Sequence, residues 1–214
     1  MEIDFSDYFP SSEREFATIE HLGKPARRLA IRRNYPTTAE NLWHAITNKE
    51  RISGWFTVVD GNLELGGRFA LEGNAEGEII ECTPEQSYKI TWEYAGDISW
   101  VNVYIEPAPD GVNFLLEHIA YIPQEWMDQY GPGAAGVGWD LGLLGLGHHL
   151  TTGELHTPAE SEEWALSDSG KTFINESSSL WCVASIADGT PPESARKAAA
   201  NTTAFYTDTE PPQN

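Results

Sequence analysis

Hydrophobic and polar residues alternate with a period of two through much of the chain between positions 16 and 122. Such alternation is typical of half-buried β-strands. Residues 16–20 and 27–33 predict a hairpin around the turn at 23–25. Shorter runs follow, separated by glycine and proline turns: RFALE, GEIIEC, SYKITWEY, WVNVYIE and VNFLLEHIAYI. The shorter runs predict a meander that together with the hairpin forms an antiparallel sheet of about seven strands, with one apolar face that needs a cover.

Residues 37–56, between the hairpin and the meander, change to helical spacing. Leu42, Ala45 and Ile46 fall on one face, and Thr38 can act as the N-cap. Gly54 ends the segment. We therefore expect two short helices over 38–54.

Residues 136–150, GVGWDLGLLGLGHHL, combine the leucine spacing of a helix with five glycines. At 100° per residue, the helix predicted over 137–152 carries two apolar stripes. One stripe is Trp139, Leu143, Leu146 and Leu150, and the opposite one is Leu141, Leu144 and His148. Each interior glycine costs about 0.5–1 kcal/mol relative to alanine, so packing on both faces has to offset that cost.

The three glycines on the flank, Gly138, Gly142 and Gly145, are expected to face closely packed backbone. The first stripe covers the sheet. We expect the second stripe to be covered by the C-terminal segment or, as the alternative, by a second subunit in a homodimer.

The C-terminal part of the chain, 153–207, reads as helices broken at Gly170 and Gly189. Its apolar residues, including Trp164, Trp181 and Phe205, need a surface to pack on. The polar segment 1–15 predicts a flexible N-terminus, and 208–214 a disordered tail.

Charge narrows the range of partners. The chain of 214 residues has 33 acidic and 13 basic residues, a formal net charge of -20. Such a field repels nucleic acid and anionic membranes. The lack of a long apolar run or signal-like N-terminus indicates a cytoplasmic protein without membrane attachment. Its two cysteines, Cys82 and Cys182, are then expected as thiols rather than as a disulfide.

Several motifs along about 27–152 together resemble a known family. They are TAENLWHAIT with KERISGWF, LELGGRF, GEIIECTPEQSYKITWEY, LLEHIAYI and GWDLGLLGLGHHL. In this order they resemble the SRPBCC (START-like, Bet v 1-like) superfamily, and within it the branch named after activators of the heat-shock-chaperone ATPase. The resemblance implies an α+β helix-grip fold over 16–152, in which a curved antiparallel sheet surrounds a long C-terminal helix that Trp139 begins. The segment 153–207 would be a helical extension, and similar tails occur in some bacterial members.

The helix-grip fold implies a cavity between sheet and helix. The strand and helix phases indicate most of its lining, and Trp55 and Trp100 are expected near its mouth. The expected ligand-binding residues are Trp55, Phe69, Leu71, Trp92, Trp100, Phe114, Leu116, His118, Trp139 and Leu143. His118 could hydrogen-bond a ligand or act as an acid or base, but a buried histidine satisfied by a neighbour is the favoured interpretation.

Other candidate chemistry is weaker. His148 and His149 are adjacent and point to different helix faces, so with His156 they predict no zinc site. Most glutamates alternate onto the solvent face, which disfavours a hydrolytic carboxylate pair. Residues 177–179 lack the G-x-S-x-G motif of a nucleophilic serine. Arg68 is expected in a surface ion pair rather than clamping an anionic ligand.

Three function classes remain. The favoured one is non-enzymatic binding of a small hydrophobic molecule, without a cofactor. The alternatives are a polyketide cyclase or aromatase-like enzyme that uses the same cavity, and a protein-interaction module like the chaperone activator. The fold does not decide among them, because one scaffold hosts many functions.

Overall fold

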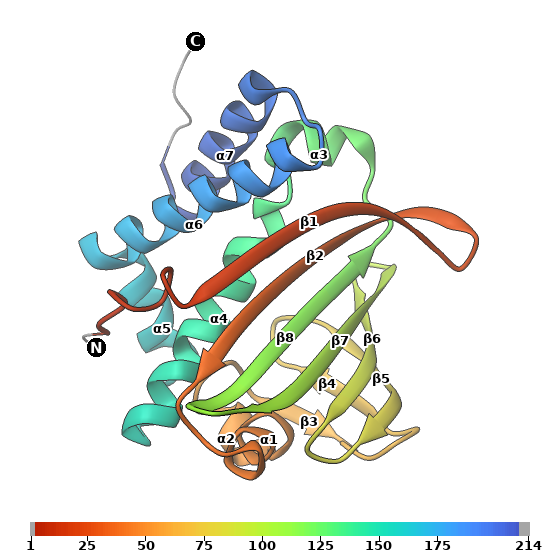
Figure 1. Ribbon diagram of the computed structural model, residues 1–214, viewed down its shortest axis with the longest axis vertical. Coiled ribbons are helices and arrows are strands. Elements are labelled where there is room, and N and C mark those ends of the chain that lie inside the picture. Colours follow the sequence, from red (N-terminus) through yellow and green to blue (C-terminus); the bar gives the residue numbers. More distant parts are fainter. Residues whose placement is uncertain (1–2, 210–214) are drawn as a thin grey trace.

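The computed structural model describes residues 3–209, and it shows one curved sheet with helices along one side and at one end (Figure 1). The strands are β1 Ser12–His21, β2 Lys24–Tyr35, β3 Val59–Gly61, β4 Arg68–Leu71, β5 Glu76–Thr83, β6 Ser87–Tyr94, β7 Asp97–Ala108 and β8 Gly111–Ala120. The helices are α1 Ala39–Thr47, α2 Lys49–Ile52, α3 Gln124–Tyr130, α4 Gly133–Thr152, α5 Pro158–Leu166, α6 Asp168–Ala187 and α7 Pro192–Thr207.

The eight strands found among the described residues form one antiparallel sheet in the order β1-β2-β8-β7-β6-β5-β4-β3. The first hairpin turns at Leu22 and Gly23, both with positive φ, as a two-residue turn that matches strand twist requires. The sheet curves, and α4 runs along its inner side while α1 and α2 close one end (Figure 1). This is the predicted α+β helix-grip fold, with one short strand, β3, more than expected.

The inner face of the sheet and α4 share one core. Ile31 of β2, Val103 of β7 and Leu116 of β8 are buried together with Leu143 and Leu146 of α4. In α1, Thr38 caps the first turn and the predicted residues Leu42, Ala45 and Ile46 are buried. The period-two and helical patterns therefore oriented these elements correctly.

Helix α4 begins at Gly133, earlier than the resemblance implied. Other parts of the chain pack closely against its glycines. A Cβ added at Gly145 would lie 2.7 Å from the Trp55 carbonyl oxygen, so backbone approaches there as expected. At Gly142 the neighbour is the Phe56 ring, and at Gly138 it is the Tyr206 hydroxyl. The expectation of backbone contact is thus wrong at those two positions, where aromatic side chains take the space.

The second stripe of α4 is covered in part by the C-terminal segment, since Leu141 and His148 remain partly exposed. Leu144 is 4% exposed and shares a core with Ile3 and with Trp164 of α5. Trp181 of α6 is fully buried, whereas Phe205 of α7 is 67% exposed and does not pack inward as expected.

The carboxylate of Asp140, on α4, joins three distant parts of the chain. It is fully buried and accepts hydrogen bonds from the Tyr8 hydroxyl at 2.9 Å, Ser177 Oγ at 2.6 Å and Trp181 Nε1 at 2.9 Å. Arg14 Nη2 and Nε donate to it at 2.7 and 3.0 Å. This network fastens α6 and the N-terminal segment to α4.

The prediction of a flexible segment over 1–15 is consequently wrong for the described residues. Strand β1 begins at Ser12, and Tyr8 and Phe9 are buried. These aromatic residues pack on α6 and Tyr8 reaches Asp140, a partner that the local sequence does not indicate.

The extension holds α5, α6 and α7, and its first break differs from the prediction. Ser167 caps α6, and Gly170 lies in the first turn of that helix, where a Cβ would meet the Trp164 carbonyl oxygen at 2.2 Å. Gly189, with φ of 100°, does follow the end of α6. Of the predicted disordered tail, 210–214 lies outside the described residues.

Candidate functional site

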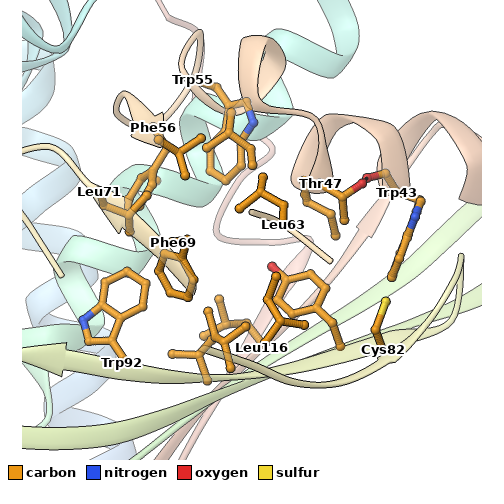
Figure 2. Close-up of a pocket in the computed structure, with 18 of the residues that line it drawn as sticks. Trp43, Thr47, Trp55, Phe56, Leu63, Phe69, Leu71, Cys82, Trp92 and Leu116 are labelled. Atoms are coloured by element: carbon orange, nitrogen blue, oxygen red, sulfur yellow. Dashed lines mark hydrogen bonds between the residues drawn. The ribbon is translucent and has the colours of Figure 1, made fainter. Parts of the chain in front are cut away.

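A cavity of about 420 Å³ lies between the inner face of the sheet, the α1–α2 pair and α4 (Figure 2). Eight of the ten residues expected at a ligand site line it: Trp55, Phe69, Leu71, Trp92, Phe114, Leu116, Trp139 and Leu143. Glu64 and Leu65, in the connection between β3 and β4, line it while exposed to solvent. The cavity therefore opens toward that connection.

Aromatic rings form the wall of the cavity nearest α4. The Phe56 ring stacks on Trp139 with centroids 6.1 Å apart and planes 9° apart, and Trp92 lies 5.2 Å from Trp139. Trp55 is held in place because its Nε1 donates to the carbonyl oxygen of Ala45, on α1, at 3.0 Å. Flat rings in fixed positions suit a planar apolar ligand.

Few polar groups face the cavity with free hydrogen-bonding capacity. Thr47 Oγ1 donates to the Trp43 carbonyl oxygen at 2.7 Å, and the indole nitrogens of Trp55 and Trp139 also have partners. Tyr88 lines the cavity, and no described residue hydrogen-bonds its hydroxyl. Burial raises the pKa of Tyr88, so the hydroxyl stays protonated and can donate to a ligand.

His118 does not line this cavity, contrary to expectation, because its ring is held in a hydrogen-bond chain behind the Trp139 indole. Trp139 Nε1 donates to His118 Nδ1 at 3.0 Å, so the His118 proton is on Nε2 and is donated to Ser99 Oγ at 2.8 Å. Ser99 Oγ donates in turn to the Trp92 carbonyl oxygen. Burial lowers the pKa of His118 to about 4. The imidazole is therefore neutral near pH 7 and orients Trp139.

Trp100 is the other residue placed incorrectly by sequence reasoning. It lies on the outer face of the sheet, with its ring centroid 4.3 Å from that of His21 and 5.5 Å from that of Tyr121. In WVNVYIE both strand faces carry apolar residues, and the inward set is Val101, Val103 and Ile105. Contact between an outward-facing tryptophan and a residue of β1 cannot be read from the alternation within β7.

The α1–α2 region supplies cavity residues that were not predicted from the sequence, among them Trp43, Ile46, Ile52 and Phe56. These residues line the cavity because of how the α1–α2 pair packs against the sheet and α4. Hydrophobic periodicity does not predict that packing. Tyr88 was also omitted, although it shares the inward face of β6 with Trp92.

The other residues considered for chemistry are Arg68, the two cysteines and the histidines near the end of α4. Arg68 pairs with Glu93 at 2.8 Å on the surface, as expected. Both cysteines are free, and Cys82 borders the cavity. Near the end of α4, His149 turns away to accept from Arg51 Nε at 3.0 Å, whereas His148 and His156 lie together. In the described part of the chain, none of the helices is long and apolar enough to span a membrane.

Comparison with known proteins identifies the family. A sequence model described as "Activator of Hsp90 ATPase homolog 1-like protein" matches residues 36–150. The chain belongs to this family. The match covers the α1–α2 pair, the strands β3 to β8 and all but the end of α4, and it stops before the extension.

Solved structures agree with the assignment. The crystal structure of CalU16 from Micromonospora echinospora is 29% identical and has a TM-score of 0.66, with 81% of this chain and 97% of that chain covered. Its solution structure gives a TM-score of 0.70 and covers 84% of this chain and 97% of that chain at the same identity. MLL2253 from Mesorhizobium loti, at 23% identity, shares the fold with a TM-score of 0.54, covering 60% of this chain and all of that chain. No curated protein matches the chain significantly.

Proposed function

We propose that this protein binds a small hydrophobic molecule, without catalysis, in the cavity between the sheet and α4. The observation that supports the proposal most is the cavity itself, about 420 Å³ and lined mainly by apolar side chains. Small-molecule sites are typically apolar hollows of about 300–1,000 Å³ with a few convergent polar groups. A ligand in an apolar hollow of this size would gain van der Waals contacts with the side chains that line it.

The wall of Phe56, Trp92 and Trp139 favours a ligand with a flat, apolar ring system. The Tyr88 hydroxyl favours one hydrogen-bond acceptor on that ligand. A neutral ligand is preferred over an anionic one, because the chain carries a net charge of -20.

The enzymatic alternative, a cyclase or aromatase-like activity in the same cavity, has less support. Acid–base catalysis needs a group that reaches the substrate and titrates near the working pH. His118 does neither, since both its ring nitrogens are engaged and its pKa is near 4. The alternative of a chaperone-activating module rests on the family description and gives no reason for an open apolar cavity.

Titration with a neutral fluorescent probe tests the proposal. N-Phenyl-1-naphthylamine is apolar, planar in its naphthalene part and uncharged. We expect saturable binding at one site per chain, with enhanced probe emission. Leu116→Trp should abolish it, because residue 116 is 3% exposed and faces the cavity.

Leu115→Trp is the matched control. Leu115 is the preceding residue of β8 and lies on the opposite face of the sheet. This variant should bind the probe as the parent protein does. No saturable binding by the parent protein, or equal binding by the Leu116→Trp variant, would contradict a ligand site in this cavity.

A further inference from the structure

Three side chains of the metal-ligating type meet where α4 runs into the extension. His148 Nε2 lies 3.1 Å from Glu154 Oε2, and His156 Nε2 lies 3.9 Å from the same oxygen. All three ligand atoms lie within 4.8 Å of one another. The two imidazole rings are tilted by 31°, with centroids 5.0 Å apart.

Hydrogen bonding alone does not satisfy this cluster. Glu154 can pair with His148, but His156 Nε2 is buried and has no hydrogen-bond partner among the described residues. Both histidine side chains are only 13% exposed, while the carboxylate of Glu154 is 64% exposed. A buried imidazole nitrogen without a partner is costly, and a metal ion would use its lone pair.

We propose that His148, Glu154 and His156 bind a divalent transition metal, with Zn²⁺ the ion that the ligand set fits best. Two imidazole nitrogens and one carboxylate oxygen are a common three-ligand set for zinc, with a fourth position left for water. Tetrahedral bonds of about 2.0–2.1 Å place ligand atoms about 3.3 Å apart. The two separations from Glu154 Oε2, 3.1 and 3.9 Å, lie close to that value, and the two imidazole nitrogens lie within 4.8 Å of each other.

Of the three side chains, Glu154 is the one that can move to complete a metal site. His148 is fixed by α4, and the backbone of His156 is fixed because its N–H donates to the Gly54 carbonyl oxygen at 2.7 Å. Glu154 lies on the connection between the helices with an exposed side chain, so it can rotate to complete the site. His149, the neighbour that diverges, donates from Nδ1 to the Glu154 carbonyl oxygen at 2.9 Å and positions that residue.

A metal ion bound at this site would cross-link two segments of the chain. It ties the last turn of α4 to the connection leading into α5, and through His156 to Gly54, next to the cavity residues Trp55 and Phe56. Metal binding should therefore stabilise the extension and this cavity wall. The inference does not depend on the proposed ligand-binding function.

Titration of metal-stripped, untagged, full-length protein with Zn²⁺ by calorimetry tests this proposal, with Co²⁺ as an optical probe of tetrahedral coordination. We expect one ion per chain, a tetrahedral Co²⁺ spectrum and a higher Tm with Zn²⁺. Glu154→Gln alters an exposed side chain and should fold normally. It should weaken Zn²⁺ binding by at least the ~10–100-fold that loss of an outer-shell partner costs, and His156→Asn should do the same.

His44→Asn is the control, because His44 is exposed on α1 outside the cluster. That variant should bind Zn²⁺ with unchanged affinity. Absence of stoichiometric binding by the parent protein, or the same affinity in the Glu154→Gln and His156→Asn variants, would show that the three side chains form only a hydrogen-bonded cluster.

Discussion

The buried carboxylate of Asp140 offers a direct test of how the extension is attached. Asp140→Asn keeps the shape of the side chain but removes its charge. In the parent structure the carboxylate accepts from Tyr8, Ser177 and Trp181, and it pairs with Arg14, whose side chain is 4% exposed. The substituted amide has one oxygen to accept with, and its NH₂ group is directed at groups that themselves donate.

The magnitude follows from two losses. Breaking a buried ion pair by removing one partner costs about 3–5 kcal/mol, because Arg14 is left as an uncompensated charge. At least one further buried donor then lacks an acceptor, which adds about 1–3 kcal/mol. The total of about 4–8 kcal/mol is comparable with the whole stability of a domain, about 5–15 kcal/mol.

Urea denaturation followed by tryptophan fluorescence and circular dichroism measures the effect. We expect the midpoint of Asp140→Asn to fall by more than about 1 M. The double variant Arg14→Met/Asp140→Asn should be more stable than Asp140→Asn alone, since no unpaired charge remains buried. Asp128→Asn, at an exposed position of α3, should change stability by less than about 0.5 kcal/mol. A loss below about 1 kcal/mol in Asp140→Asn would refute the argument that this carboxylate anchors the extension.

Three further predictions concern His118, the glycines of α4 and Tyr88. His118 has a pKa of about 4 in the folded state and about 6.5 when unfolded, so its contribution to stability is present above pH 6.5 and is lost as the pH falls toward 4. The free energy of unfolding should fall by about 3 kcal/mol over this pH range. Urea denaturation of His118→Gln at several pH values should not show this fall, and the same pH dependence in the variant would contradict the low pKa of His118. Gly145→Ala should lower Tm because its Cβ would lie 2.7 Å from the Trp55 carbonyl oxygen. Gly142→Ala, with Phe56 at 3.4 Å, should be neutral or stabilising by up to about 1 kcal/mol. Equal effects of the two substitutions on Tm would refute the difference in packing. Tyr88→Phe should weaken calorimetric binding of 2-acetylnaphthalene about 2–10-fold and leave 2-ethylnaphthalene unaffected, and equal loss for both would show that the hydroxyl donates no hydrogen bond.

Period-two alternation and family resemblance together predicted the fold, because they report which side of each strand faces the core. Trp92 and Leu116 were oriented correctly on that basis, and Leu42 on the helical period. Trp100 was expected near the mouth of the cavity without support from alternation, and it lies instead on the outer face of β7, against aromatic residues of β1 and of the segment after β8.

Long-range partners account for most of what the sequence did not predict. Tyr8 lies in a polar segment, and its order depends on Asp140, which is 132 residues away. Gly170 resembles a helix break, but it is needed for close approach to the Trp164 carbonyl. His148 and His156 are brought together by the path of the connection after α4, which residue spacing alone does not specify.

If the cavity binds a hydrophobic molecule in the cell, the isolated protein should carry that molecule. Native mass spectrometry of the chain, isolated without denaturation from the organism that encodes it, tests this most directly when the Leu116→Trp variant is isolated in parallel. We expect a mass above that of the polypeptide, which falls to the polypeptide mass on denaturation with release of an apolar compound. We expect no such adduct on the variant. A parent chain at the bare polypeptide mass, or the same adduct on the variant, would contradict it.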